Sequence, residues 1–255
     1  GKLLVSSALL FYVAFSHISF EIDQAFLKPI LKYSVKLLPV LLFGWFFQFA
    51  DRFLAEHFLI PEVFGSFGFI VSAAALIMTG FLAIGNSIQP ELYFGFKEAN
   101  SIQISKVVRH YILLIMIGVV VGLSLIIGIH EFWTAFKYHN SSASLILYAG
   151  GFFLLAFQHL YNMELFYLKK VRLITIYQNL SYASYSILLF GLFSIGYLEL
   201  VFPAILFFGT RIVIMGIYFI GQMPSSQIIK NNKGVLLFNQ LLLVILTVLS
   251  FYLIY

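Results

Sequence analysis

Long apolar runs separated by short polar gaps dominate the pattern of this chain. A helix that crosses a bilayer needs about 20 mainly apolar residues. Stretches of about that length lie at 3–20, 31–54, 64–90, 110–129, 143–168, 174–197, 200–221 and 235–255. They lack the two-residue alternation of a barrel strand and are about twice too long for one. The pattern therefore predicts an all-α, polytopic bundle of about eight transmembrane helices.

The prolines mark the ends of these runs and one expected bend. Four of the six prolines fall at or near the ends of runs, where a missing N–H costs little. Pro39 and Pro203 lie inside runs and are expected to kink their helices. Because Gly44 follows Pro39 by five residues, we expect the helix over 31–54 to be the most bent and to act as a hinge.

Composition points to lipid as the solvent of this chain. It is 62% hydrophobic and 10% charged, with a mean hydropathy of +1.00, whereas soluble domains carry about a quarter charged residues. The net charge is +5 but forms no basic run, so we expect no nucleic-acid partner. Cysteine is absent, the six histidines share no metal-ligand spacing, and no phosphate loop or nucleophile motif occurs. We therefore expect no metal or cofactor, and no enzymatic activity.

The positive charges divide unequally between the two sides that the eight runs define. Of the 15 Lys and Arg residues, eleven fall on one side: Lys28, Lys32, Lys36, Lys97, Lys106, Arg109, Lys169, Lys170, Arg172, Lys230 and Lys233. Three fall on the other, namely Lys2, Arg52 and Lys137, and Arg211 lies inside a run. The positive-inside rule places the lysine-rich side in the cytoplasm.

Residues 31–54 carry a family resemblance. Their sequence, LKYSVKLLPVLLFGWFFQFADRFL, resembles the start of the second half of Wzx-type polysaccharide flippases, which belong to the MOP exporter superfamily with its MATE-like fold. The matching residues are Lys32, Tyr33, Pro39, Trp45, Asp51, Arg52 and Phe53. Weaker matches continue at 63–70, at 88–90 and at 167–170, so the resemblance covers most of 28–221.

The resemblance implies a division of the chain. Such flippases look like two six-helix lobes that face each other across a central cavity. On that template, 1–27 would be the last helix of the N-terminal lobe plus a linker, 28–222 the six-helix C-terminal lobe, and 223–255 an additional C-terminal transmembrane helix. The expected partner of this chain is then the missing N-terminal lobe of the same polypeptide.

The resemblance also implies a function. It is the flipping of an undecaprenyl-diphosphate-linked oligosaccharide, such as an O-antigen unit of lipopolysaccharide, across the bacterial inner membrane by alternating access. Membrane lipids and a polysaccharide polymerase are the further partners it implies. The alternatives are another superfamily transporter, either a drug/cation antiporter or a peptidoglycan-precursor flippase, and a membrane enzyme such as a polymerase or ligase. Those enzymes need a large outer loop, which the short gaps here do not supply.

Arg211 is the candidate for substrate contact. It lies ~17 Å from either end of its run at 1.5 Å per residue, beyond easy snorkelling. In a wet cavity its charge would suit the pyrophosphate of a lipid-linked sugar. The alternative is a structural pair with Glu164 or with a backbone carbonyl.

Two further groups are candidates for lining the cavity. Gln48, Asp51 and Arg52 share one face of a helix end, where they would form a gate or a cap exposed to headgroups. A polar stripe recurs every seven residues on the next helix, and it either lines a cavity or bonds a neighbouring helix. This stripe consists of Ser72, Thr79 and Asn86.

A last polar group is expected to form a coupling site or a network inside the bundle. It consists of Gln158, His159, Asn162, Glu164, Gln178 and Asn179. Glu164 sits about one turn from Lys169 and would pair with it. His159 would carry a coupled proton, although a hydrogen-bonded histidine inside the bundle is the favoured interpretation.

Overall fold

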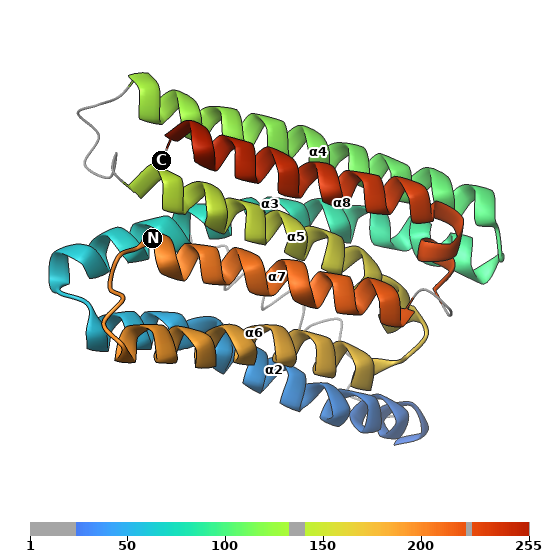
Figure 1. Cartoon of the computed structure of the whole chain (residues 1–255). Helices are drawn as coiled ribbons and strands as arrows, with labels where there is room; N and C mark the ends of the chain where they lie inside the picture. The colour runs from blue at the N-terminus through green and yellow to red at the C-terminus, as the bar shows by residue number, and fades with distance from the viewer. Residues whose placement is uncertain (1–23, 133–140, 223–225, 255) are drawn as a thin grey trace, which may run out of the picture. The chain divides into compact units, whose positions relative to one another are not determined.

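The computed structural model describes residues 24–132, 141–222 and 226–254. These residues form helices and no strand (Figure 1). The helices are α2 (Gln24–Phe58), α3 (Pro61–Lys97), α4 (Ser101–Phe132), α5 (Ser142–Tyr167), α6 (Val171–Ser194), α7 (Val201–Gln222) and α8 (Gln227–Ile254). Each apolar run from 31–54 onward corresponds to one helix, so the all-helical prediction is confirmed; the run at 3–20 lies outside the described residues.

The number of membrane-crossing helices differs from the predicted eight. In the described part of the chain, five helices are long and apolar enough to cross a membrane: α3, α4, α5, α7 and α8. The helix α6 falls short because polar side chains such as Gln178, Asn179 and Ser181 recur along its first half. The helix α2 is not among the five either, and its first half carries Lys28 and Lys32.

The chain divides into two compact units within α2. The first unit ends at Leu38 and the second runs from Pro39 to Tyr255. The division therefore coincides with the proline at which the sequence predicts a hinge. The bending itself, and the role of Gly44, stay predictions.

In the second unit α5 is the central helix. It packs against α3, α4, α6, α7 and α8 (Figure 1). Glycines let its neighbours come close because they carry no Cβ. A Cβ on Gly151 would lie only 2.5 Å from Cε1 of Phe207 in α7. A Cβ on Gly150 would lie 2.5 Å from Cγ2 of Thr247 in α8. Small residues at such crossings permit the close approach typical of membrane helices.

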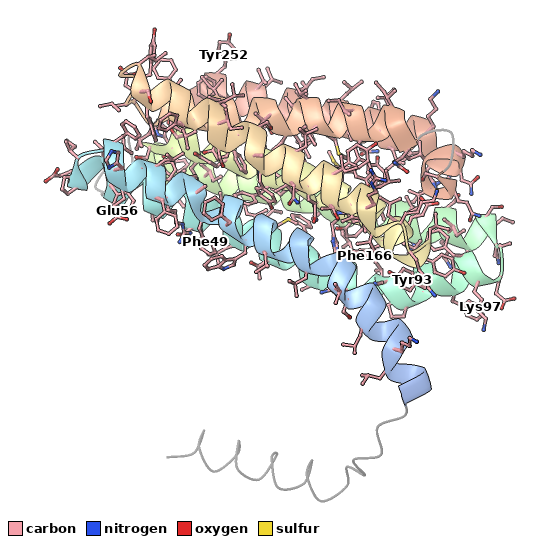
Figure 2. The ribbon with its side chains drawn as sticks, turned by 90° about the horizontal axis from the view of Figure 1, so that it is seen from below. Phe49, Glu56, Tyr93, Lys97, Phe166 and Tyr252 are labelled. Carbon is pink, nitrogen blue, oxygen red and sulfur yellow. The ribbon has the colours of Figure 1, made fainter. Side chains whose placement is uncertain are left out.

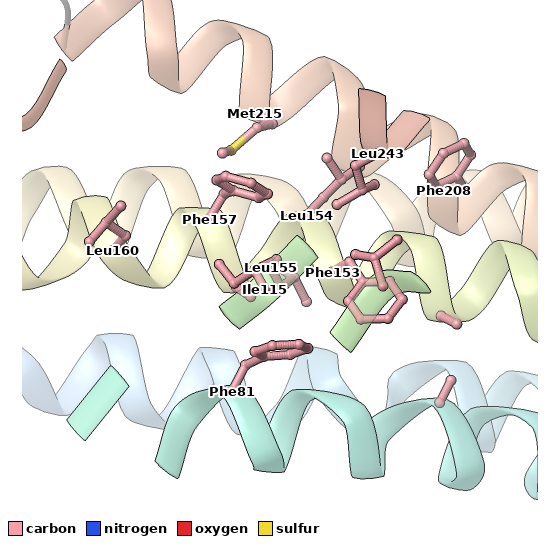
Figure 3. Close-up of a cluster of buried hydrophobic side chains, with 14 of the residues drawn as sticks. Phe81, Ile115, Phe153, Leu154, Leu155, Phe157, Leu160, Phe208, Met215 and Leu243 are labelled. Carbon is pink, nitrogen blue, oxygen red and sulfur yellow. The ribbon is translucent and has the colours of Figure 1, made fainter. Parts of the chain in front are cut away.

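The side chains around α5 form one aromatic and aliphatic core. Phe81 of α3 and Phe153 of α5 meet with ring centroids 5.6 Å apart, and the close-up in Figure 3 shows both beside Leu155 and Ile115. On the other side of α5, Phe157 lies toward Met215 of α7 (Figure 3). This packing holds α5 and α7 in a fixed register, and α7 carries Arg211.

Consecutive helices of the second unit run antiparallel, so their ends gather in two sets. We call the lysine-rich end the one at which α3, α5 and α7 finish and α4, α6 and α8 begin (Figure 1). Lys97 and Tyr93 lie at this end, whereas Glu56 of α2 lies at the opposite end (Figure 2). From α3 onward, the two ends of the helices are therefore the two sides between which the sequence analysis divided the Lys and Arg residues.

Candidate functional site

A small cavity lies among five helices of the second unit. Its volume is about 50 Å³, and we call it the Arg211 cavity. Its lining comes from α2, α3, α5, α6 and α7: Phe49, Asp51, Arg52, Val71, Ala75, Phe152, Tyr182, Tyr185, Phe207 and Arg211. The sequence analysis treated Arg211 separately from Asp51 and Arg52, which lie on another helix, and the structure brings the three residues together in this cavity.

Arg211 is the most deeply buried charge in this cavity, with 2% of its surface exposed. Its Nη1 donates a hydrogen bond to Oγ of Ser181 in α6. The guanidinium lies 4.5 Å from the ring centroid of Tyr182 and 4.7 Å from that of Phe207. Its Nε and Nη2 are buried without a hydrogen-bond partner among the described residues. Since a buried donor without a partner costs about 1–3 kcal/mol, and more when charged, these two nitrogens are suited to bind water or an anion.

The other two charges come from adjacent positions of α2. Asp51 is 5% exposed and lines the cavity together with Arg211. The Arg52 backbone N–H donates to Oδ1 of Asp51 at 2.8 Å, and its Nη2 donates to Oγ of Ser72 in α3 at 3.3 Å. Two positive charges and one negative charge therefore line the cavity, so its formal charge is positive.

Tyrosines form much of the remaining polar surface. The hydroxyls of Tyr185 and Tyr148 are 2.8 Å apart, and both side chains are buried. The sequence analysis missed Ser181, Tyr182 and Tyr185, although a signal was present. Together with Gln178 they occupy positions i, i+3, i+4 and i+7, which lie on one helical face.

The predicted polar stripe on α3 lies on the exposed face of that helix. Ser72, Thr79 and Asn86 are all exposed. Ser72 accepts from Arg52 at the cavity, while Thr79 donates to its own backbone at Ala75 O, 3.2 Å away. The stripe therefore begins at the Arg211 cavity and runs away from it along α3.

The exposed surface of α3 differs from that of α4. Around its stripe, α3 also exposes small residues such as Gly80 and Ala83, and Leu76 is the one large aliphatic side chain exposed between Ser72 and Asn86. By contrast, α4 exposes a row of large aliphatic side chains: Leu113, Leu114, Ile117, Val120, Val121 and Leu125. Large aliphatic side chains suit lipid, whereas a small and polar surface suits water or another protein surface.

Glu164 has a structural role that the sequence analysis did not foresee. Its Oε1 accepts the backbone N–H of Gln227 at 2.6 Å, and its Oε2 accepts from the hydroxyl of Ser226. A carboxylate at the first turn of α8 is favoured by the helix dipole. The expected pairs with Arg211 and Lys169 are both wrong, because α8 packs against α5 and supplies nearer donors.

The rest of this polar group does not line the Arg211 cavity. Asn162 accepts from the hydroxyl of Tyr218 at 3.1 Å, which ties α5 to α7. His159 packs against α3, where a Cβ on Gly85 would lie 2.6 Å from its Cδ2. Buried side-chain atoms of Gln158, His159 and Asn179 have no hydrogen-bond partner among the described residues.

One candidate residue, Gln48, remains without structural detail. The side chain of Gln48 lies outside the described side chains, so its place at the cavity stays a prediction. Within the described part of the chain, no three His, Asp or Glu side chains gather closely enough to hold a metal ion.

Comparison of the chain with protein-family models, with curated proteins and with solved structures found no match. The fold does indicate the class of protein. The described residues form a helical bundle in which five helices are able to cross a membrane by length and composition, which indicates a multi-pass membrane protein.

Proposed function

We propose that this chain is part of a flippase that moves an undecaprenyl-diphosphate-linked oligosaccharide across the bacterial inner membrane. The observation that carries the proposal is Arg211, whose Nε and Nη2 are buried without a hydrogen-bond partner among the described residues, in a cavity inside the helical bundle. An ionisable group at such a depth is costly and marks a substrate pathway or a structural pair. Ser181 is neutral, and Asp51 is the one acidic residue among two arginines in the described cavity lining, so a net positive charge is left for an anion.

The charges around the cavity favour an anionic substrate. Arg52 and Arg211 supply two fixed positive charges, and Asp51 supplies one negative charge. A guanidinium binds phosphate oxygens through paired N–H donors. The diphosphate of a lipid-linked sugar is an anion of this kind, and its sugar would meet the Tyr182 ring and the polar stripe of α3.

The size of the cavity sets a condition on the mechanism. A volume of about 50 Å³ holds one or two water molecules, which is too little for a diphosphate-linked sugar. The substrate would therefore reach Arg211 only when α2 or α3 moves away from α6 and α7. Movement of one helix group against another around a fixed site is how alternating-access transporters work, and the stripe on α3 would face the widened space.

Asp51 supports a second candidate function. A buried carboxylate beside a cavity is also the group that a drug or cation antiporter needs to bind a cation or a proton. The two candidates differ in which charge is indispensable. Anion transport requires Arg211 and tolerates a neutral residue at position 51, whereas cation antiport requires Asp51.

Substitutions in the chromosomal gene that encodes this chain test the proposal. Arg211→Gln should abolish most surface polysaccharide and cause the lipid-linked unit to accumulate, while Arg211→Lys keeps part of the export. Lys97→Gln, an exposed change at the lysine-rich end, is the matched control. Surface staining measures export and blotting measures abundance. Normal export by an Arg211→Gln protein of normal abundance would disprove the proposal. The antiporter would be favoured if Asp51→Asn, at normal abundance, abolished cation efflux while surface polysaccharide stayed unchanged.

A further inference from the structure

A second pocket lies at the lysine-rich end, on a different face of the bundle from the Arg211 cavity. Its volume is about 590 Å³, within the range of about 300–1,000 Å³ that small-molecule sites occupy. It is an open pocket between the start of α4 and the start of α8. The lining residues are Ser101, Ile102, Ser105, Lys106, Arg109, His110 and Asn231.

The lining of this pocket suits an anion. Lys106, Arg109 and His110 occupy positions i, i+3 and i+4 of α4, so they share one face, and all three are exposed. Ser105 and Asn231 add neutral hydrogen-bonding groups. None of the described lining residues is acidic. Because Ser101 begins α4, the positive end of the helix dipole adds to the two permanent charges.

The pocket sits at the level of lipid headgroups. Residues 111–129 of α4 form the apolar run that follows it, and at 1.5 Å per residue they span about 28 Å. The hydrocarbon core of a bilayer is about 30 Å thick. If this run fills the core, Lys106 and Arg109 lie in the interface, where phosphates of the lipid are found.

The surface beyond the pocket suits acyl chains. The α4 face that carries Lys106 and Arg109 continues with Leu113 and Ile117, both more than half exposed. Beyond the kink at Asn232, α8 also exposes large side chains: Phe238, Leu241 and Ile245. The helices α4 and α8 pack against each other. A basic pocket therefore opens directly onto an apolar surface formed by the same two helices.

We propose that this pocket binds the phosphodiester headgroup of an anionic phospholipid whose acyl chains lie along α4 and α8. Lys106 and Arg109 contact the phosphate, and Ser105 and Asn231 bond the glycerol hydroxyls. Basic pockets between membrane helices bind anionic headgroups in this way. The site is separate from the Arg211 cavity and does not depend on what that cavity transports.

Lipid titration of the purified chain in neutral detergent tests the proposal. Short-chain phosphatidylglycerol is added, and bound lipid is counted by native mass spectrometry alongside the thermal stability. The wild-type chain should hold phosphatidylglycerol about tenfold or more tightly than the double variant Lys106→Gln with Arg109→Gln does. The matched control is Lys97→Gln with Arg172→Gln, which removes one Lys and one Arg from the same end outside the pocket. This control should bind like the wild type.

Two ligand controls identify the source of the phosphate. Phosphatidylcholine at equal concentration should bind more weakly than phosphatidylglycerol. Glycerol 1-phosphate should not displace phosphatidylglycerol when it is added at the concentration at which phosphatidylglycerol saturates the pocket. If glycerol 1-phosphate did compete at those concentrations, the pocket would not be a lipid site. The result would show that the acyl chains contribute nothing to the affinity. Equal loss of affinity in the two double variants would also overturn the proposal, since it would show general attraction to a basic surface.

Discussion

Asp51 and Arg211 line the same small cavity, and their opposite charges predict a measurable coupling across it. Both side chains are at least 95% buried and line the same 50 Å³ space. Neutralising one of them leaves the other as an uncompensated charge. Arg211→Gln and Asp51→Asn are therefore each expected to destabilise the folded chain, by about 1–3 kcal/mol.

The double variant should be much less unstable than the sum of the two single variants. In Asp51→Asn with Arg211→Gln, no buried charge is left without its partner. Residues that share one network show coupling free energies of about 0.5–3 kcal/mol. We expect a value near the middle of that range, because the two groups interact through the cavity and a water there would bridge them.

Glu164 supplies the matched control. Its carboxylate bonds Ser226 and Gln227 at the start of α8 and shares no bond with Arg211. Glu164→Gln combined with Arg211→Gln should therefore be additive within about 0.5 kcal/mol. Unfolding of the purified chain by titration with a denaturing detergent gives all five free energies. Additive effects of Asp51→Asn and Arg211→Gln would refute the pairing.

Three further predictions concern packing, the start of α8 and orientation. Gly151→Ala should lower the free energy of unfolding by about 1–3 kcal/mol because its Cβ would meet Phe207 at 2.5 Å. Gly209→Ala, where a Cβ would have no neighbour within 4 Å, should not lower it. Thermal unfolding compares the two variants, and equal stability would contradict the packing. Glu164→Gln should speed hydrogen exchange of the first backbone amides of α8, because the carboxylate bonds the first of them. Glu91→Gln, a change at an exposed position, should leave their exchange unchanged. Unchanged exchange in Glu164→Gln would show that the carboxylate does not stabilise the start of α8. In intact cells Leu198→Cys should react with an impermeant thiol reagent and Lys170→Cys should not, in a chain without natural cysteine; the reverse pattern would invert the predicted orientation.

The helices could be predicted from the sequence because lipid imposes a simple requirement on it. Every backbone N–H and C=O in the hydrocarbon must be paired within its own helix, so a long apolar run has one solution. The runs at 64–90 and 110–129 correspond to α3 and α4, and the observed helices extend beyond them into polar residues. Helix ends outside the hydrocarbon follow no such requirement, which is why α4 begins at Ser101 rather than at residue 110.

Side-chain partners could be predicted less well because they depend on which helices are neighbours. Arg211 was expected to be buried, and it is. The alternative to substrate contact was a pair with Glu164 or with a backbone carbonyl, but the packing of α7 against α6 gives Arg211 a hydrogen bond to Ser181. In the same way, the packing of α8 against α5 gives Glu164 the start of α8. Apolar periodicity defines a buried face but not the helix that covers it.

Transfer of a diphosphate-linked oligosaccharide between leaflets tests the central claim most directly. The protein is placed in vesicles that carry a fluorescent undecaprenyl-diphosphate-linked oligosaccharide, and an impermeant quencher reports which leaflet holds it. We expect the wild type to transfer the lipid faster than protein-free vesicles do. Arg211→Gln should slow the transfer by about tenfold or more, as loss of a hydrogen bond to a charged group implies, and Lys97→Gln should not. Transfer by Arg211→Gln at the wild-type rate, or by the wild type at the protein-free rate, would contradict the account.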